Sequence, residues 1–380
     1  MTIRLGLTFD DVLLEPRRTA VKRQCALVAT RLSKGVRLAI PLIAAASDTV
    51  SDARFAIALG KLGGMAVLHR NVSLEEQVQM VKEVKAAGVT VGAAVGPLDV
   101  ARAVALAEAG ASVIFIDCAH AHAPGIIAAA KEMKKRFKSL HPHSISPSKE
   151  GERVPTQLVV GNVATKEAAK DFLGIADALK VGIGPGAICT TRIISGVGVP
   201  QLTAIMDVVS VAQKKGIPVI ADGGIRFSGD IVKALAAGAS SVMMGSMFAG
   251  TEETPGEIIT ENGKQYKSYR GMGSKEALEK RHATDRYAAE SKDSTTSVSG
   301  HSSSTEEEKR KKSHVVEGVT GKVRYKGPVA GIVEEMVGGI TAGMGYIGAA
   351  TIEEMWKQAR FIQITGAGLQ ESHPHSGFKL

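Results

Sequence analysis

Cysteine, aromatic residues and long apolar runs are all scarce in this sequence. The 380 residues include three cysteines, Cys25, Cys118 and Cys189, which lie far apart in the chain. Their spacing matches neither a disulfide framework nor a C-x-x-C metal pattern, so we expect a reducing compartment. One Trp and five Tyr provide few surfaces on which bases could stack, so binding to nucleic acid is not expected.

The N-terminal stretch MTIRLGLTFDDVLLEP lacks the continuous apolar block of a signal peptide, because acidic residues interrupt it. No apolar run elsewhere is long enough to cross a bilayer. We therefore expect no membrane partner and a cytoplasmic location. The formal net charge of +9 is compatible with anionic ligands, including phosphorylated metabolites. The charged run EEEKRKK at 306–312 lies in a Ser-rich stretch and is predicted to be solvated.

Apolar residues are plentiful, and they fall in eight short runs. They make up 44% of the chain, which is enough for a large buried core. The runs are rich in Val, Ile and Ala and alternate with stretches of helical period, a pattern typical of βαβ units in a parallel sheet. The predicted strands are 41–46, 65–70, 90–95, 112–117, 157–162, 176–181, 218–223 and 241–246. They predict an α/β fold, a (β/α)8 TIM barrel, with residues 1–380 as a single catalytic domain.

The predicted helices between these strands have recognisable ends. Examples are SDARFAIALGKLGG, SLEEQVQMVKEVKAAG, PLDVARAVALAEAGA and SGDIVKALAAGA. Each begins with Ser or Pro, which we expect to start the helix, and each is followed by Gly, which we expect to close it.

Glycine-rich segments follow the sixth, seventh and eighth predicted strands. They are GIGPGAICTTR at 182–192, Gly223–Gly224 after Asp222, and Gly245–Ser246. In such barrels functional residues lie where strands end, and the loops after strands seven and eight often bind phosphate. One glycine alone is more often a tight turn, but three successive loops favour a site for a phosphorylated ligand. The spacing in GIGPG is not G-x-G-x-x-G, and TTR follows instead of a helix with the expected acidic residue, so a Rossmann domain is disfavoured.

Two polar segments interrupt the barrel pattern. Residues 138–156 are predicted to be a loop inserted before the fifth strand. Residues 288–314 have almost no apolar content and should be mobile when nothing is bound. Arg286 and Tyr287 on one side and VVEGVTGKVRYKG on the other favour a mobile catalytic lid, at about 285–325, over a simple linker.

Several motifs of distinctive composition are spread over nearly the whole chain. They are LTFDDVLLEP (7–16), GNVAT (161–165), GIGPGAICTTR (182–192), ADGGIR (221–226), GSMFAGTEETPGE (245–257), YRGMGS (269–274), DRY (285–287) and GAGLQESHPH (366–375). In this order they resemble the motifs of the inosine-5′-monophosphate (IMP) dehydrogenase family.

The resemblance implies a reaction in which Cys189 attacks C2 of the purine of IMP. Hydride would then leave C2 for NAD, and water would hydrolyse the covalent thioimidate to xanthosine monophosphate (XMP). Arg286 and Tyr287 on the lid would activate that water, and Thr191 would help to hold it. This is the committed step of guanine nucleotide synthesis.

The resemblance also implies which residues bind the two nucleotides. Asp222 would bind the ribose hydroxyls of IMP through charge-assisted hydrogen bonds. The other substrate residues would be Gly224, Gly245, Ser246 and Tyr269 at the phosphate, and Gly271, Met272, Gly273 and Glu317 at the purine. The cofactor residues would be Asp117, at the nicotinamide ribose, with Gly182 and Gly184.

A potassium ion belongs to the implied site as well. It would bind the loop carbonyls of Gly184, Gly186 and Cys189. Carbonyls of Glu371, Ser372 and His373 from a neighbouring subunit would complete its coordination. A homotetramer is therefore implied.

The sequence departs from the family pattern in four places. The CBS regulatory modules of most members are absent between about residues 85 and 90, so regulation through them should be absent. Ala187 stands where a phosphate-binding Ser is usual, and Ser47 stands where Met is usual. AHAHA replaces AHGHS, and the lid is longer than expected.

Two alternatives remain open. A GMP reductase shares the barrel and the cysteine loop, but it usually lacks the Arg-Tyr pair and the GLQESH tail. A purine-nucleotide-binding protein without turnover would bind IMP and produce no reduced NAD. His120 and His122 resemble a metal pair but have no evident third ligand, so metal binding there is not expected.

Overall fold

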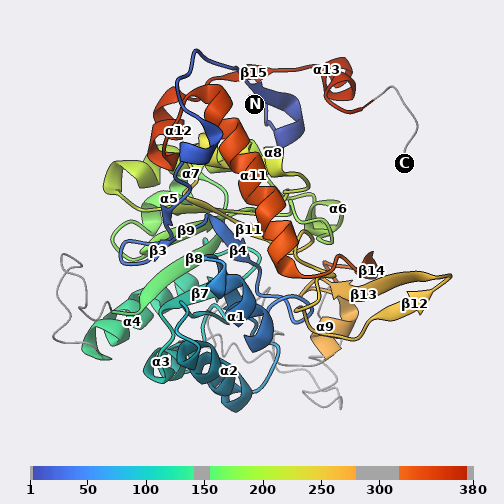
Figure 1. Cartoon of the computed structure of the whole chain (residues 1–380). Helices are drawn as coiled ribbons and strands as arrows, with labels where there is room; N and C mark the ends of the chain where they lie inside the picture. Colours follow the sequence, from blue (N-terminus) through green and yellow to red (C-terminus); the bar gives the residue numbers. More distant parts are fainter. Residues whose placement is uncertain (1–2, 141–154, 280–315, 375–380) are drawn as a thin grey trace.

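The computed structural model describes residues 3–140, 155–279 and 316–374, and a closed barrel of parallel strands lies at its centre (Figure 1). Around the barrel the order is β4 (Leu42–Ala44), β5 (Met65–Leu68), β6 (Gly92–Val95), β7 (Val113–Asp117), β8 (Gln157–Val163), β9 (Ala178–Val181), β10 (Val219–Asp222) and β11 (Ser241–Met244). Parallel pairing of β11 with β4 closes the ring. Each strand overlaps a predicted one, so the predicted (β/α)8 barrel is confirmed.

Helices cover the outside of the barrel. Those that follow the first seven strands are α1 (Ala53–Lys61), α2 (Leu74–Ala86), α3 (Val100–Ala109), α4 (Pro124–Leu140), α5 (Lys166–Asp171), α7 (Gln201–Ala212) and α8 (Ser228–Ala236). The long helix α11 (Val329–Ile347) packs against α8 and α1 and takes the eighth position (Figure 1). It is followed by α12 (Ile352–Gln358), which also packs on α8.

Two of the predicted helix starts are shifted. The helix in SDARFAIALGKLGG is capped by Asp52, whose side chain accepts the Phe55 amide, and not by the preceding Ser. The helix in PLDVARAVALAEAGA is capped by Asp99. Asp is as good an N-cap as Ser, which is why these boundaries were misplaced. Ser73 does cap α2, and Gly110 closes α3 with φ +109°.

Side chains along the strands alternate between two apolar clusters. The inner cluster includes Phe115, Ala178 and Ile220, whereas their neighbours, such as Leu179 and Ala221, pack against the helices. Since the side-chain period of a strand is two residues, the next inward positions are at 117, 180 and 222. The barrel interior is thus apolar in its middle and charged at the carboxyl ends of its strands.

The opposite end of the barrel is closed by the ribbon of β2 (Thr30–Arg31) and β3 (Arg37–Leu38). Leu32 and Leu38 belong to the inner cluster. The Gly35 amide donates to Gln157 Oε1, at the start of β8, over 2.8 Å. Because this end is covered, only the carboxyl ends of the strands are left to form a cavity.

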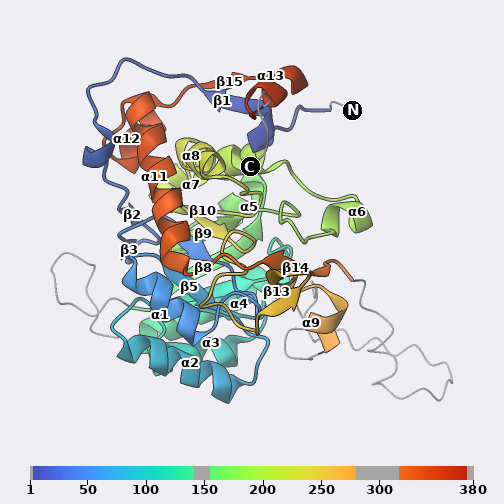
Figure 2. The same cartoon turned by 45° about the vertical axis from the view of Figure 1, so that its right-hand side comes forward.

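The remaining elements lie beside the barrel (Figure 2). Between β11 and α11 the chain forms an antiparallel sheet of β12 (Ile259–Glu261), β13 (Lys264–Arg270) and β14 (Thr320–Arg324), and α9 (Lys275–Glu279). The other elements are β1 (Val12–Leu14), which pairs with β15 (Phe361–Gln363), η1 (Phe9–Asp11), η2 (Arg23–Cys25), η3 (Gln213–Lys215), α6 (Thr191–Ser195) and α13 (Gly366–Glu371). The helix α6 begins inside the TTR segment, where none was predicted.

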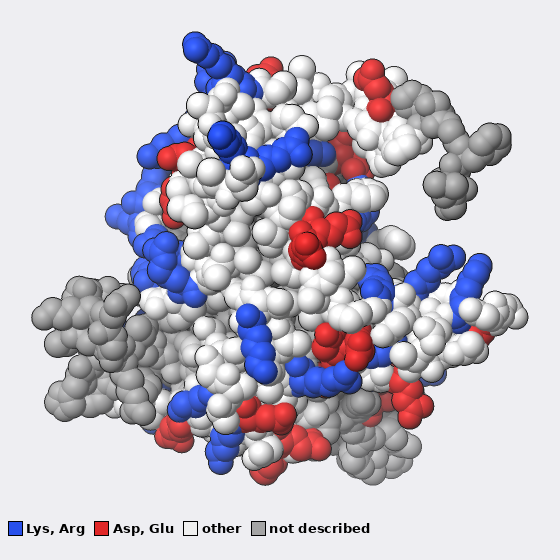
Figure 3. Space-filling view, in the orientation of Figure 1, with Lys and Arg blue, Asp and Glu red and all other residues white. Residues whose placement is uncertain are grey.

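Two surface properties follow. No helix in the described part of the chain is both long and apolar enough to span a bilayer. Lysines and arginines are interspersed with acidic side chains on the face shown in Figure 3, so the net positive charge is not gathered into one patch there.

Candidate functional site

A cavity of about 430 Å³ opens at the carboxyl ends of the barrel strands. It brings together most of the residues singled out from the sequence. The predicted residues that line it are Asp117, Gly182, Gly184, Gly186, Cys189, Thr191, Asp222, Gly224, Gly245, Ser246, Tyr269, Gly271, Met272, Gly273 and Glu317. Ser47 and Ala187, two of the departures from the family pattern, line it as well.

The barrel strands contribute a charged group, which we call the strand side: Asp117, Asn162, Lys180 and Asp222. Lys180 is 2% exposed, and its ammonium donates to Asp222 Oδ2 over 2.7 Å and to Asp117 Oδ1 over 3.3 Å. It also donates to Asn162 Oδ1. An ammonium this deeply buried needs anionic partners to offset its lost hydration.

Asn162 links this group to the glycine-rich loop. Its Nδ2 donates to Asp222 Oδ2 over 2.9 Å and to the carbonyl of Gly182 over 2.6 Å. A bulge in β8 between Gly161 and Val163 brings this side chain to the barrel interior.

The loop after β9 carries Cys189 and is held by an arginine. Arg192 donates to the carbonyls of Ile183 (3.1 Å) and Val199 (2.6 Å), and burial lowers the pKa of its guanidinium. Gly184 has φ +76° and lies close to the Arg192 side chain, so a Cβ at this position would be 2.5 Å from Arg192 Cγ. Glycine is therefore required at this position by both conformation and space.

Loops contribute a second group to the cavity, which we call the loop side: Cys189, Thr191, Gly271 and Glu317. Cys189 Sγ lies 3.2 Å from Thr191 Oγ1, and that hydroxyl donates to Glu317 Oε2 over 2.6 Å. The chain thus places a half-buried thiol beside a hydroxyl that is oriented by a carboxylate. This arrangement suits nucleophilic attack by sulfur with a positioned water.

Backbone hydrogen bonds hold the loop side together. The amide of Val319 donates to the carbonyl of Ile188 over 3.1 Å, and the amide of Gly271 donates to Val319 over the same distance. The amide of Glu317 donates to Gly273. Three segments that are distant in the sequence, around 188, 271–273 and 317–319, therefore fix the position of Cys189 through neutral backbone hydrogen bonds.

Gly245 and Tyr269 meet in the wall of the cavity. A Cβ at Gly245 would be 2.5 Å from the Tyr269 hydroxyl, so no larger residue fits there without a shift. Burial, and secondarily the charge of Asp222, raise the pKa of Tyr269 far above its usual value. Tyr269 is therefore a neutral hydrogen-bond donor at the glycine loop that was predicted to bind phosphate.

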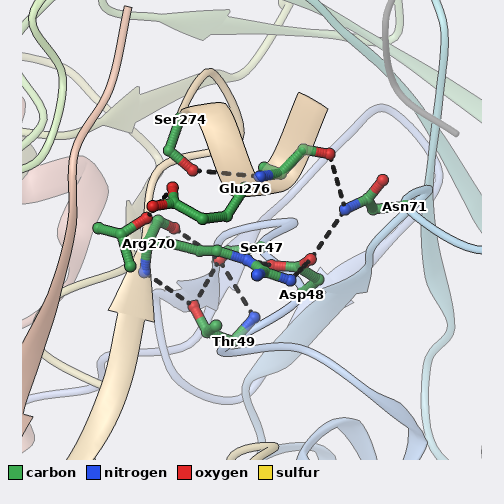
Figure 4. A network of polar contacts seen from close by, with 9 residues as sticks. Ser47, Asp48, Thr49, Asn71, Arg270, Ser274 and Glu276 are labelled. Carbon is green, nitrogen blue, oxygen red and sulfur yellow. Dashed lines mark hydrogen bonds and ion pairs between the residues drawn. The ribbon is translucent and has the colours of Figure 1, made fainter. Parts of the chain in front are cut away.

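A polar network supports the start of the Gly271–Gly273 loop (Figure 4). Arg270 forms a two-pronged ion pair with Asp48, and the hydrogen bonds from Arg270 and Asn71 keep the pKa of Asp48 low despite the raising effect of burial. Ser47 Oγ lies 3.3 Å from the Arg270 carbonyl and 3.1 Å from Thr49 Oγ1. Ser47 is thus integrated into the wall of the cavity by its hydroxyl.

Some predicted residues are not brought to the cavity. Arg286 and Tyr287 lie outside the described residues, as does most of the predicted lid; residues 320–324 of its range form β14. Glu371, Ser372 and His373 lie at the end of α13, and no hydrogen bond or ion pair within the described chain joins them to the 182–192 loop. His373 instead stacks edge-on against Phe227.

His120 and His122 lie in a part of the described chain where no cluster of three potential His, Cys, Asp or Glu ligands occurs. His122 Nε2 lies 2.8 Å from Asp171 Oδ2. Burial, and secondarily His122, lower the pKa of His120.

The sequence interpretation missed Asn162, Lys180, Asp48 and Arg270. Two of them carried a detectable signal, because Asn162 ends a predicted strand and Lys180 is a charged residue inside an apolar one. A polar residue at the carboxyl end of a barrel strand indicates a site. Asp48 and Arg270 are 222 residues apart, and only the fold pairs them.

Fold and site define a (β/α)8 barrel whose strand ends and adjoining loops surround a cavity lined by a half-buried cysteine, two aspartates and several glycines. A family model described as IMP dehydrogenase / GMP reductase domain matches residues 6–375. The chain belongs to this family.

Curated relatives agree with this assignment. The inosine-5′-monophosphate dehydrogenase of Cryptosporidium parvum is 42% identical, over 97% of this chain and 95% of that protein. The enzyme of the same name from Borreliella burgdorferi is 38% identical, over 99% and 98%. That from Thermoplasma acidophilum is 36% identical, over 97% and 94%.

Proposed function

We propose that this protein is an NAD-dependent IMP dehydrogenase, which oxidises IMP to XMP through a covalent intermediate on Cys189. The observation that carries the proposal is the cavity itself. It places Cys189, Thr191 and Glu317 in one hydrogen-bonded chain, and the Asp222 carboxylate lines the same cavity. The relatives that share nearly the whole chain bear the name of this activity.

IMP would bind along the glycine loops. Asp222 would accept hydrogen bonds from its ribose, since the Oδ2 atom is anchored by Lys180 and Asn162. Backbone amides at Gly224, Gly245 and Ser246, with the neutral Tyr269 hydroxyl, would bind the phosphate. Met272 and the glycines on either side of it would line the purine, with Glu317 at its edge.

In the proposed reaction the Cys189 sulfur forms a bond to C2 of the purine. Bound NAD would accept the hydrogen and its electron pair that leave C2, so that the purine is oxidised while the nicotinamide is reduced. Water then adds to the same carbon, the bond to sulfur breaks, and the thiol and XMP are released. Thr191, held by Glu317, would position the water, and Arg286 and Tyr287 would activate it.

The residues present fit NAD and potassium. The cavity that contains Cys189 continues to Asp117, whose carboxylate suits a second ribose. Potassium prefers oxygen ligands, and the loop offers the carbonyls of Gly184, Gly186 and Cys189. The Gly186 carbonyl accepts the Cys189 amide over 3.1 Å, which leaves its second lone pair for an ion. We also propose that a neighbouring subunit completes the potassium site with its Glu371, Ser372 and His373 carbonyls, which implies a homotetramer. A cytoplasmic location is a further part of the proposal.

The experiment that tests this function combines turnover with a search for the covalent intermediate. Wild-type protein with IMP, NAD and potassium should produce reduced nicotinamide, and with GMP and NADPH it should not consume the NADPH. Mass spectrometry during turnover should find a purine nucleotide on the 182–192 peptide. Cys189→Ala should abolish both signals, whereas Cys25→Ala, which replaces an exposed thiol, should change neither.

The alternatives give different results. Activity only with GMP and NADPH would identify a reductase, which the family description also covers. Binding of IMP without reduced nicotinamide would identify a binding protein. Turnover retained in Cys189→Ala would contradict the covalent mechanism.

A further inference from the structure

One buried cation lies between the two carboxylates that the proposed function assigns to two different nucleotides. Lys180 Nζ is 2.7 Å from Asp222 Oδ2, on the IMP side, and 3.3 Å from Asp117 Oδ1, on the NAD side. We propose that Lys180 is a positioning residue for both ribose sites, which keeps the two carboxylates ionised and aimed at their respective ribose hydroxyls. This inference rests on the proposed function.

The ammonium is needed because the carboxylates share a poorly hydrated space. Asp117 is 5% exposed, and the Asp222 side chain is 19% exposed. Two nearby carboxylates away from water disfavour each other's ionised form, so one would take up a proton if no cation lay between them. Other titratable groups that face them are Arg70, which donates to the backbone carbonyl of Asp117 over 3.4 Å, and the neutral Tyr269 near Asp222. A protonated carboxyl group is a poorer acceptor for a ribose hydroxyl than a carboxylate.

The surroundings of Lys180 fix its position. A Cβ at Gly161 would be 2.6 Å from Lys180 Cβ, so the absence of a side chain at Gly161 makes room for the lysine. Asn162 accepts from the ammonium and also donates to Asp222 Oδ2 over 2.9 Å. Within the described part of the chain, Asp222 Oδ1 makes no hydrogen bond, so this oxygen remains for the substrate.

The shared contact leads to a distinctive expectation. A residue that belongs to one nucleotide site affects the binding of one ligand. Because a single ammonium contacts both carboxylates, its removal should weaken both ligands together, and the loss should depend on pH.

The test measures the binding of IMP alone and of NAD alone by isothermal titration calorimetry, so that no turnover occurs. In Lys180→Met both dissociation constants should rise roughly tenfold or more at neutral pH. Affinity should then recover as the pH is raised, because the protonated carboxyl group ionises, while the wild type changes little over the same range. Lys180→Arg keeps the charge and should restore a flat pH profile.

Lys134→Met is the matched control, since it also removes a lysine paired with an aspartate, Asp177, but lies on α4 outside the cavity. It should change neither affinity. If Lys180→Met does not give folded protein by circular dichroism, Lys180→Gln is measured in the same way. Loss of one ligand only, or an equal loss at every pH, would overturn the positioning role.

The wild-type turnover assay separates the two proposals. If the wild type does not oxidise IMP with NAD, the proposed function fails. If it does, and Lys180→Met binds both nucleotides as the wild type does, the inference about Lys180 fails alone.

Discussion

The strand side and the loop side of the cavity are held in place by different forces. On the strand side, side chains of three barrel strands surround one buried ammonium, and their contacts are ionic. On the loop side, backbone amides and carbonyls join the segments around 188, 271 and 319. Charges on the strand side depend on one another, whereas the backbone contacts on the loop side are neutral and individually weaker.

This difference suits the two tasks of the proposed enzyme. Recognition of a ribose needs a carboxylate that does not move, and a rigid barrel strand provides it. The cysteine must approach and then leave the purine carbon, which is easier from a loop that backbone hydrogen bonds join to its neighbours. Substitutions on the strand side should therefore affect stability more than equivalent substitutions on the loop side.

The largest effect is expected for Asp222→Asn. It removes one of two carboxylates from Lys180 and weakens the acceptor for IMP. The free energy of unfolding should fall by about 2 kcal/mol, and IMP affinity should fall roughly tenfold to a hundredfold. Chemical denaturation and calorimetric titration measure these changes. Asp99→Asn, at the start of α3, is the control, because Asn caps a helix as well as Asp does.

A smaller effect is expected for Gly245→Ala, which adds a methyl group 2.5 Å from the Tyr269 hydroxyl. Overpacking of this kind costs about 1–3 kcal/mol of unfolding free energy, and we expect the lower end, about 1 kcal/mol, because the contact is with the far end of the Tyr269 side chain. Tyr269→Phe in the same chain should recover most of it, because the nearest ring carbon is 3.5 Å from the added Cβ. Absence of this rescue in thermal or chemical unfolding would show that the clash lies elsewhere.

Glu317→Gln tests the loop side with the same chemical change as Asp222→Asn. The amide oxygen can still accept from Thr191, so unfolding free energy should change by less than about 1 kcal/mol. Turnover should fall roughly tenfold, since the charge that orients the Thr191 hydroxyl is lost. A stability loss as large as that of Asp222→Asn would break the comparison between the two sides.

The smallest effect concerns pH and Tyr269. Its pKa is raised by burial, so the folded state keeps a proton that the unfolded state loses near pH 10. The stability that Tyr269 contributes is present below pH 10 and is lost as the pH rises further. Unfolding free energies of the wild type, relative to Tyr269→Phe, should therefore decline above pH 10. A constant difference between the two proteins would show that Tyr269 is not held in its neutral form.

The sequence was sufficient to predict most of the barrel and of the cavity lining. Period and composition located all eight strands, and the rule that sites follow strand ends selected Asp222, Gly224 and Gly245. Helix starts were less accurate, because Asp52 and Asp99 are caps as good as the Ser and Pro that were chosen. The Arg286–Tyr287 pair stays a prediction, since it lies outside the described residues.

Partners distant in the chain could not be predicted. Thr191 and Glu317 are 126 residues apart, and Lys180 and Asp117 are 63 apart. Nothing in the local pattern of either residue specifies the other. Ser47, noted only as a departure from the family, proved to be bonded to the Arg270 carbonyl, which depends on the approach of β13 to the loop after β4.

The sequence by itself determined which segments are strands and helices, that glycines follow the last strands, and which side chain is the candidate nucleophile. The strands, helices and glycine turns depend on local periodicity and on backbone freedom, which neighbouring residues fix, whereas the nucleophile was selected by the resemblance of its loop to a family motif. Closure of the barrel decided the rest. It turned every second strand residue inward, so that Lys180 came to lie between Asp117 and Asp222, where a buried positive charge is stable only because two negative charges surround it.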